Sequence, residues 1–124
     1  MVEITAEYPA GKIGTTLENL KAAAMGENLE WTNLYPSFAK VADDEGFKDI
    51  ATTFRMIAKA EKAHEARYNK LYSNLESGKV FISDEVIIWK CRNCGYLHEG
   101  KNVPEICPSC LHPRAYFQIK ENNY

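Results

Sequence analysis

Residues 89–110, W-K-C-R-N-C-G-Y-L-H-E-G-K-N-V-P-E-I-C-P-S-C, contain all four cysteines of this 124-residue chain. The cysteines form two C-x-x-C pairs with twelve residues between the pairs, and two such turns can direct four thiolates at one ion. Gly95 after the first pair can adopt a positive φ, and Pro108 within the second pair restricts φ where the chain folds back. The spacing predicts a mononuclear metal site whose ligands are Cys91, Cys94, Cys107 and Cys110.

Two disulfides are the alternative use of four cysteines, and the start of the chain argues against it. Residues 1–14 show no signal-peptide pattern, which favours a reducing compartment, where disulfides are rare. The ligand set does not identify the metal, because four thiolates hold zinc in structural sites and iron in electron-transfer sites. The cysteines alone therefore leave zinc and iron open.

The composition is that of an ordinary globular chain, with 45% apolar residues and a net charge of -2. This charge gives no basic footprint for a nucleic-acid partner. No apolar run approaches the roughly 20 residues that a membrane-spanning helix needs. We expect no nucleic-acid partner, no membrane partner and a cytoplasmic location.

Residues 15–78 have the period of an antiparallel helical hairpin. Thr15 and Glu18 form a capping box at the start of the first helix, and Pro36 is expected to kink this helix without ending it. A turn at 43–46 precedes the second helix, which stops at 77–78. The apolar stripes are Leu17, Leu20, Ala24, Trp31, Leu34, Phe38 and Val41 on the first helix and Phe47, Ile50, Phe54, Ile57, Tyr68, Leu71 and Leu75 on the second.

The segments on either side of the hairpin lack a helical period. Residues 1–14 are rich in proline and glycine and are expected to form an extended arm. Residues 79–124 contain β-prone pieces at 86–90, 96–98 and 115–119, which predict a small ribbon around the cysteines. So short a segment buries little apolar surface, so we expect the bound ion to hold it together. The predicted fold class is α+β.

Three charged residues occupy positions in these stripes where apolar residues belong. Glu27 interrupts the stripe of the first helix, and Glu61 and His64 interrupt that of the second. Facing positions in an antiparallel hairpin share a common sum, and a turn centred near residue 44 places Glu27 opposite Glu61, roughly 25 Å from the turn. His64 lies one helical turn beyond Glu61, and Glu30 one turn beyond Glu27.

Two carboxylates that face each other in an apolar seam repel, and each is costly to desolvate. Divalent cations reverse this balance. A ferritin-like di-iron bundle takes a lone Glu from each of two helices and a Glu-x-x-His from each of the other two. Glu27 fits the lone Glu, and E-K-A-H, from Glu61 to His64, fits the Glu-x-x-His. A hydrogen-bonded polar cluster without metal is the alternative.

The whole chain resembles the rubrerythrins, peroxide-reducing non-haem iron proteins that join a ferritin-like di-iron bundle to a rubredoxin-like domain. The resemblance rests on K-I-G-T-T-L-E-N-L-K-A-A-A, G-E-N-L-E-W-T-N-L-Y-P, A-K-A-E-K-A-H-E-A-R-Y and W-K-C-R-N-C-G-Y-L-H-E-G-K. It implies iron rather than zinc on the four cysteines. It divides the chain into an arm at 1–14, half of a di-iron bundle at 15–78 and a rubredoxin-like domain at 79–124.

The same resemblance implies a role for each residue of the seam site. Glu27 resembles a terminal iron ligand, Glu61 a bridging carboxylate, and His64 the imidazole ligand of the same iron. Glu30 resembles the carboxylate that ligates the other iron in the oxidised state and is replaced by a histidine on reduction. Tyr35 resembles the tyrosine that hydrogen-bonds near the site.

The chain departs from the family pattern in having one helical hairpin where the bundle needs two. The other Glu and Glu-x-x-His are absent, and so is the histidine that would exchange with Glu30. We therefore expect a homodimer or a companion chain to supply the second hairpin.

The implied activity is the reduction of hydrogen peroxide to water. Electrons would come from an NADH-linked donor, a rubredoxin or a reductase, through the cysteine-bound iron. A rubredoxin-like electron carrier without a working di-iron site and a zinc-ribbon interaction protein are the alternatives.

Overall fold

The computed structural model describes residues 1, 3, 5 and 13–124. It divides into two compact units, residues 1–73 and residues 74–124. The expected arm at 1–14 falls largely on residues outside the described part of the chain. The fold class is α+β, as predicted, and we describe each unit by itself.

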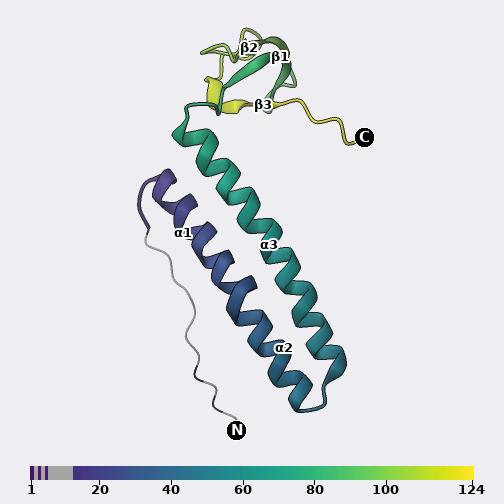
Figure 1. Ribbon diagram of the computed structural model, residues 1–124. Coiled ribbons are helices and arrows are strands. Elements are labelled where there is room, and N and C mark those ends of the chain that lie inside the picture. The colour runs from purple at the N-terminus through teal and green to yellow at the C-terminus, as the bar shows by residue number, and fades with distance from the viewer. Residues whose placement is uncertain (2, 4, 6–12) are drawn as a thin grey trace. The chain divides into compact units, whose positions relative to one another are not determined.

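The first unit is an antiparallel helical hairpin (Figure 1). One side consists of α1 (Thr16–Leu29), a π-helical turn η1 (Glu30–Leu34) and α2 (Tyr35–Asp44). The other side is α3 (Lys48–Glu76), whose last residues belong to the second unit. The predicted capping box is present, since Thr15 accepts from the Glu18 N–H and the Glu18 carboxylate accepts from the Thr15 N–H.

The π turn η1 is the feature of the hairpin that the sequence did not predict. Tyr35 N–H donates to the carbonyl of Glu30 five residues back. Pro36 has no N–H and its ring crowds the carbonyl of residue 32 in regular α-helix. The chain accommodates Pro36 by widening the preceding turn, and α2 starts with this proline in its first turn. Such π turns are frequent at functional sites.

The turn between α2 and α3 forms where it was predicted. Gly46 has φ 89°, a left-handed conformation that glycine adopts without strain. Its N–H donates to Asp43, and Phe47 N–H donates to Ala42 at 2.7 Å, which ends the helix in the usual way. The Asp43 carboxylate then pairs with Arg55 across the hairpin.

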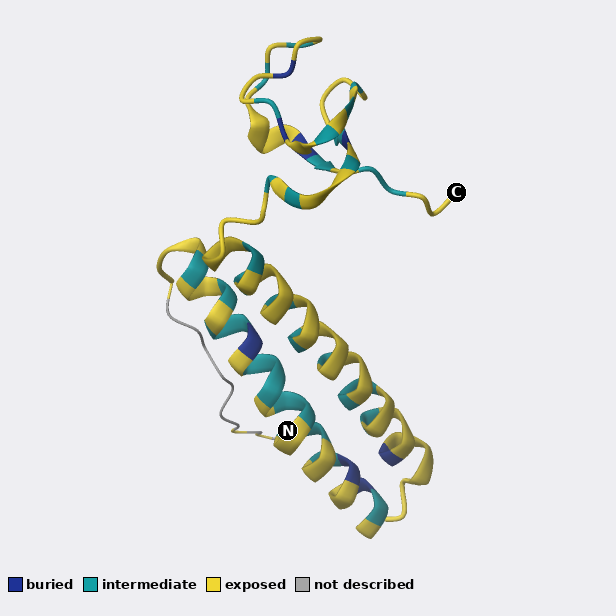
Figure 2. Ribbon diagram, turned by 45° about the horizontal axis from the view of Figure 1, so that its top comes forward, coloured by how far each residue is buried: buried dark blue, intermediate teal, exposed yellow. Residues whose placement is uncertain are grey.

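The core of the hairpin is made of small side chains. Its buried residues are Ala24, Ala39, Ala42 and Ala51. Several members of the predicted stripes are exposed, because a single hairpin offers each helix one partner and leaves the other side uncovered (Figure 2). These exposed members are Val41, Phe47, Ile50, Leu71 and Leu75.

The second unit contains a three-stranded antiparallel sheet in the order β2-β1-β3. Its strands are β1 (Ile82–Cys91), β2 (Leu97–Asn102) and β3 (Phe117–Ile119), and a short 3₁₀ turn, η2 (Arg114–Tyr116), precedes β3. All three expected strands are present. β1 begins earlier than expected, and the residues before Phe117 form the 3₁₀ turn instead of strand.

The sheet packs around two of the cysteines. The buried core is Trp89, Cys91, Val103, Cys107 and Phe117. The Trp89 indole N–H is satisfied by the carbonyl of Gly100 at 3.0 Å. Among the described residues, no helix is both long enough and apolar enough to cross a membrane.

Candidate metal centres

The four cysteine sulfurs lie within 4.8 Å of one another. Cys91 Sγ is 3.7 Å from Cys110 Sγ, and Cys94 Sγ is 3.7 Å from Cys107 Sγ. Disulfide sulfurs would be about 2.0 Å apart, whereas a tetrahedral ion with bonds of about 2.3 Å holds its sulfurs about 3.8 Å apart. The sulfurs therefore have the spacing of a tetrahedral metal site, and the four cysteines are free thiols.

Two equivalent turns hold these sulfurs. In the first, Gly95 N–H donates to the carbonyl of Cys91 at 2.8 Å, and in the second, Leu111 N–H donates to the carbonyl of Cys107 at 2.9 Å. Gly95 has φ 83° and Leu111 has φ 62°. The second turn therefore holds a leucine in the left-handed conformation that the first turn assigns to glycine.

The environment of the sulfurs favours a bound cation. Burial raises the pKa of Cys107 to about 11, while a hydrogen bond from the backbone of His112 lowers the pKa of Cys110 to about 6. Cys91 and Cys107 are fully buried and Cys94 is exposed. A buried thiolate needs a positive partner, so a metal ion fits this centre, with one edge of the site open to solvent.

The charged residues predicted to face each other in the apolar seam of the hairpin also come together, and we call Glu27, Glu61 and His64 the seam cluster. Glu27 on α1 and Glu61 and His64 on α3 place one potential ligand atom each within 4.8 Å of the others. His64 Nδ1 lies 2.6 Å from Glu61 Oε2 and 3.5 Å from Glu27 Oε2. The register inferred from the sequence, which sets residue 27 opposite residue 61, is confirmed by these distances.

Glu27 is the unsatisfied member of this cluster. Its Oε2 atom is buried and has no hydrogen-bond partner. Burial raises the pKa of Glu27, and a hydrogen bond with Glu61 and the negative charges of Glu61 and Glu30 raise it further. An orphaned carboxylate oxygen beside a second carboxylate and an imidazole nitrogen is a donor set that suits a divalent iron ion. The residues present therefore fit one side of a di-iron centre.

The structure does not bring Glu30 and Tyr35 into this group of three. Glu30 lies at the start of η1, and its charge acts on Glu27, but its carboxylate is not among the ligand atoms that converge. The Tyr35 ring packs against Phe38 and Phe54, with centroids 6.2 and 6.1 Å away. The ligand role of Glu30 and the hydrogen-bonding role of Tyr35 stay predictions.

Sequence reasoning missed a polar network beside the cluster. The stripe pattern predicts an apolar role for Trp31, but its indole N–H donates to Glu65 at 2.5 Å. Asn28 donates to the same carboxylate. The signal was present in the sequence, because Asn28, Trp31 and Glu65 directly follow Glu27, Glu30 and His64.

Comparison with known proteins agrees with both centres. Residues 2–72 match the family model described as rubrerythrin, and residues 89–118 match the model described as the rubredoxin-like domain of rubrerythrin. The chain belongs to the rubrerythrin family. Membership answers the question that the cysteines left open, because rubrerythrins are iron proteins, and the cofactor is iron.

Two curated rubrerythrins align with essentially the whole chain. The rubrerythrin of Porphyromonas gingivalis is 57% identical over 124 residues, covering 100% of this chain and 62% of the relative. Rubrerythrin-1 of Clostridium acetobutylicum is 60% identical over 124 residues, covering 99% of this chain and 63% of the relative. The chain thus spans less than two thirds of the length of these rubrerythrins.

A solved structure of nigerythrin in a partially reduced state has a similar fold. It superposes with a TM-score of 0.51 at 29% sequence identity, over 90% of this chain and 52% of that chain. This similarity agrees with the hairpin and the four-cysteine ribbon described above.

Proposed function

We propose that this rubrerythrin-family chain reduces hydrogen peroxide to water at a di-iron centre, with electrons supplied through the cysteine-bound iron. The observation that carries the proposal is the convergence of Glu27, Glu61 and His64 in a chain that also holds four thiolates at tetrahedral spacing. The reaction consumes two electrons and two protons for each peroxide and gives two water molecules. Iron held by Glu27, Glu61 and His64 and by a second hairpin would supply the two electrons, one from each of two ferrous ions.

The residues of the hairpin hold and balance the charge of that centre. Glu27 and Glu61 neutralise the cations, and the buried Oε2 of Glu27 gains the partner that it lacks. His64 presents Nδ1 to the cluster. We assign Glu30 as a reserve carboxylate, because it lies one turn from Glu27 and its negative charge raises the pKa of Glu27. We assign Tyr35 as a hydrogen-bonding neighbour of the site.

A second hairpin completes the centre in this proposal. Two copies of the chain bring two each of Glu27, Glu61 and His64, which makes six ligands for two irons, with two Glu30 in reserve. The copies would share one four-helix bundle by a two-fold contact. A companion chain that carries a different hairpin is the alternative, and it would bring the histidine that exchanges with Glu30.

The four-cysteine iron is proposed as the entry point for electrons. Cys94 is exposed, so an NADH-linked donor, a rubredoxin or a reductase, can approach one side of the iron. Thiolate ligation and a buried interior keep reorganisation small, which suits electron transfer. Free thiols require reducing conditions, so we propose a cytoplasmic location.

A second candidate function is a rubredoxin-like electron carrier. One observation favours it, because the described chain holds a complete four-thiolate set and only three converging ligands at the seam. In that case the hairpin would serve assembly alone.

The substitution Glu61→Ala separates the two functions. It removes a ligand from the seam cluster and leaves the cysteines untouched. We expect peroxide turnover to fall by at least about 100-fold, because a metal ligand is lost, while the visible absorption of the ferric thiolate centre is unchanged. Peroxide turnover at the wild-type rate in this variant would leave only the electron carrier.

A further inference from the structure

A polar network crosses the helical hairpin directly beside the carboxylate cluster. Its members are the residues that follow Glu27, Glu30, Glu61 and His64 in the chain, namely Asn28, Trp31, Lys62 and Glu65. One step along a helix turns the side-chain direction by about 100°. The network therefore occupies the neighbouring faces of the same helical turns that carry the cluster.

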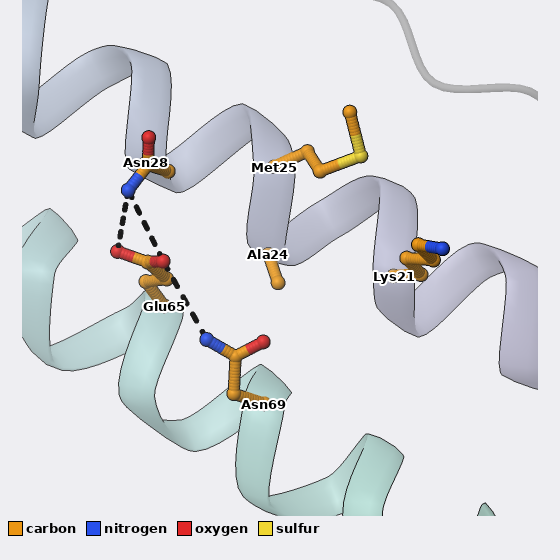
Figure 3. A pocket seen from close by; sticks show the side chains of 6 residues that line it. All are labelled: Lys21, Ala24, Met25, Asn28, Glu65 and Asn69. Atoms are coloured by element: carbon orange, nitrogen blue, oxygen red, sulfur yellow. Dashed lines mark hydrogen bonds between the residues drawn. The ribbon is translucent and has the colours of Figure 1, made fainter.

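Glu65 is the acceptor on which the network converges. Its Oε2 accepts from Trp31 Nε1 at 2.5 Å, and both carboxylate oxygens lie 3.2 Å from Asn28 Nδ2. Asn69 Nδ2 reaches Glu65 Oε1 at 3.5 Å. Figure 3 shows the amide groups of Asn28 and Asn69 directed at this carboxylate from the two helices. The Lys62 ammonium lies 5.0 Å from the centroid of the Trp31 ring.

Apolar packing at this level of the hairpin is thin. A groove of about 310 Å³ runs beside the network, lined by Lys21, Ala24, Met25, Asn28, Glu65 and Asn69 (Figure 3). Ala24 is the buried apolar side chain here. The contacts between the two sides of the hairpin at this level include the hydrogen bonds from Asn28 and Trp31 to Glu65.

Trp31 also belongs to the π turn. It is the second residue of η1, and the carbonyl of the preceding Glu30 accepts the wide hydrogen bond from Tyr35. The π-helix is rare, and it occurs mostly as a single turn inside an α-helix, frequently at a functional site. The bond from Trp31 to Glu65 joins this turn to α3.

We propose that Trp31 and Glu65 are positioning residues that clamp η1 to α3 and thereby hold Glu27 at the distance from Glu61 and His64 that iron requires. This inference rests on the proposed function, because it concerns the same cluster. Partners that orient metal ligands typically change metal affinity by 10- to 100-fold when removed.

The test measures the affinity of the full chain for Co(II) at the cluster of Glu27, Glu61 and His64. One equivalent of zinc first occupies the four thiolates, so the visible d–d absorption of added Co(II) reports binding at this cluster. We expect Trp31→Phe, which keeps the ring and removes the donor, to bind Co(II) about 10- to 100-fold more weakly than wild type. Glu65→Gln keeps a carbonyl acceptor for Trp31 and should retain most of the affinity that Glu65→Ala loses.

Arg55→Ala is the matched control. It breaks the ion pair between Arg55 and Asp43, which also joins the two sides of the hairpin but lies nearer the turn. We expect this variant to bind Co(II) like wild type. Wild-type affinity in Trp31→Phe, or an equal loss in Arg55→Ala, overturns the clamp.

A metal-independent measurement separates this inference from the proposed function. If the wild-type chain binds no Co(II) at the seam, a di-iron centre completed by copies of this chain is ruled out. Amide hydrogen exchange over residues 27–34 then decides the clamp. Faster exchange in Trp31→Phe with unchanged exchange in Arg55→Ala supports it, and equal rates in the two variants contradict it.

Discussion

Glu27 is the residue at which folding and metal binding make opposite demands. Its Oε2 is buried without a partner, and burial with the nearby carboxylates raises the pKa of the side chain. A buried polar atom left unpaired destabilises the folded chain. The same oxygen stabilises a bound cation, so the cost of the unpaired atom indicates a binding site.

Glu27→Gln should therefore stabilise the metal-free hairpin at neutral pH while weakening metal binding. The amide has nearly the same shape, carries no charge and can donate to Glu61. We expect a gain of about 1 kcal/mol at pH 7, the lower end of the cost of a buried unpaired group, because 17% of the Glu27 side chain is exposed. Thermal unfolding followed by the helical circular dichroism signal measures it.

The pH dependence of this gain tests its cause. The folded-state pKa of Glu27 is raised above its ordinary value near 4.5. As pH rises above about 4.5, Glu27 therefore ionises in the unfolded chain while it keeps its proton in the folded chain. Wild type loses stability over that window, and Glu27→Gln does not. The gain should be absent near pH 4 and grow toward neutral pH. The exposed Glu45 provides the control substitution, and an equal gain in Glu45→Gln would contradict this explanation.

At the residue level, the sequence predicted the cluster because a charge in an apolar stripe is conspicuous and the hairpin register is simple arithmetic. It did not predict the network of Trp31 and Glu65. The stripe pattern predicts that a tryptophan packs as an apolar residue. The hydrogen-bond partner of its indole N–H can be identified only when the spacing of the two helices is known. The neighbour relation of Glu65 to His64 was visible, but neighbours on a helix usually face different surroundings.

Among the elements, the two cysteine turns serve both the metal site and the fold of the ribbon. Cys91 and Cys107 contribute both to the metal site and to the buried core that includes Trp89 and Phe117. Leu111 adopts a left-handed φ, which costs about 1 kcal/mol or more for a residue other than glycine. We therefore expect a bound ion to offset both the burial of the thiolates and the backbone strain at Leu111.

Cys107→Ser should melt the ribbon and leave the helices. The change removes one of four ligands at a fully buried position, and small metal domains are often unfolded without their ion. We expect amide protection over residues 85–119 to be lost while α1 and α3 keep theirs. Arg92→Ser, an exposed change within the first turn, is the control. If the ribbon keeps its protection after complete metal removal, the ion is not what holds it together.

The helix ends were predictable because they depend on local chemistry, as the Thr15 capping box and the turn at Gly46 illustrate. The π turn η1 was not. Pro36 predicts a disturbance in the helix, but a kink, a helix end and a widened turn can each accommodate a proline. Local sequence does not distinguish these outcomes, and the π turn also contacts α3 through the bond from Trp31 to Glu65.

For the whole molecule, the main feature is the uncovered side of the hairpin. Ile50, Leu71 and Leu75 follow the same helical spacing as Glu61 and His64 and are exposed. Two members of the apolar stripe of the first helix lie inside the hairpin, since Ala24 is buried and Trp31 donates to Glu65 on α3. The apolar stripes predict a surface shared by both sides of the hairpin, but the exposed apolar surface is formed mainly by α3.

We predict that the isolated chain forms a homodimer through this surface and holds about two irons per chain, one on its cysteines and one as its share of a common di-iron centre. The argument is that one contact answers two needs, covering the apolar side of α3 and completing the ligand set. Sedimentation combined with iron counting measures both quantities.

Leu71→Glu places a charge in the contact and should weaken association by more than about tenfold, with loss of the shared iron and retention of the cysteine-bound iron. Lys70→Glu, one residue earlier and on a different face of α3, should behave like wild type. A stable wild-type monomer that carries only its cysteine-bound iron would rule out the homodimer and leave a companion chain as the source of the second hairpin.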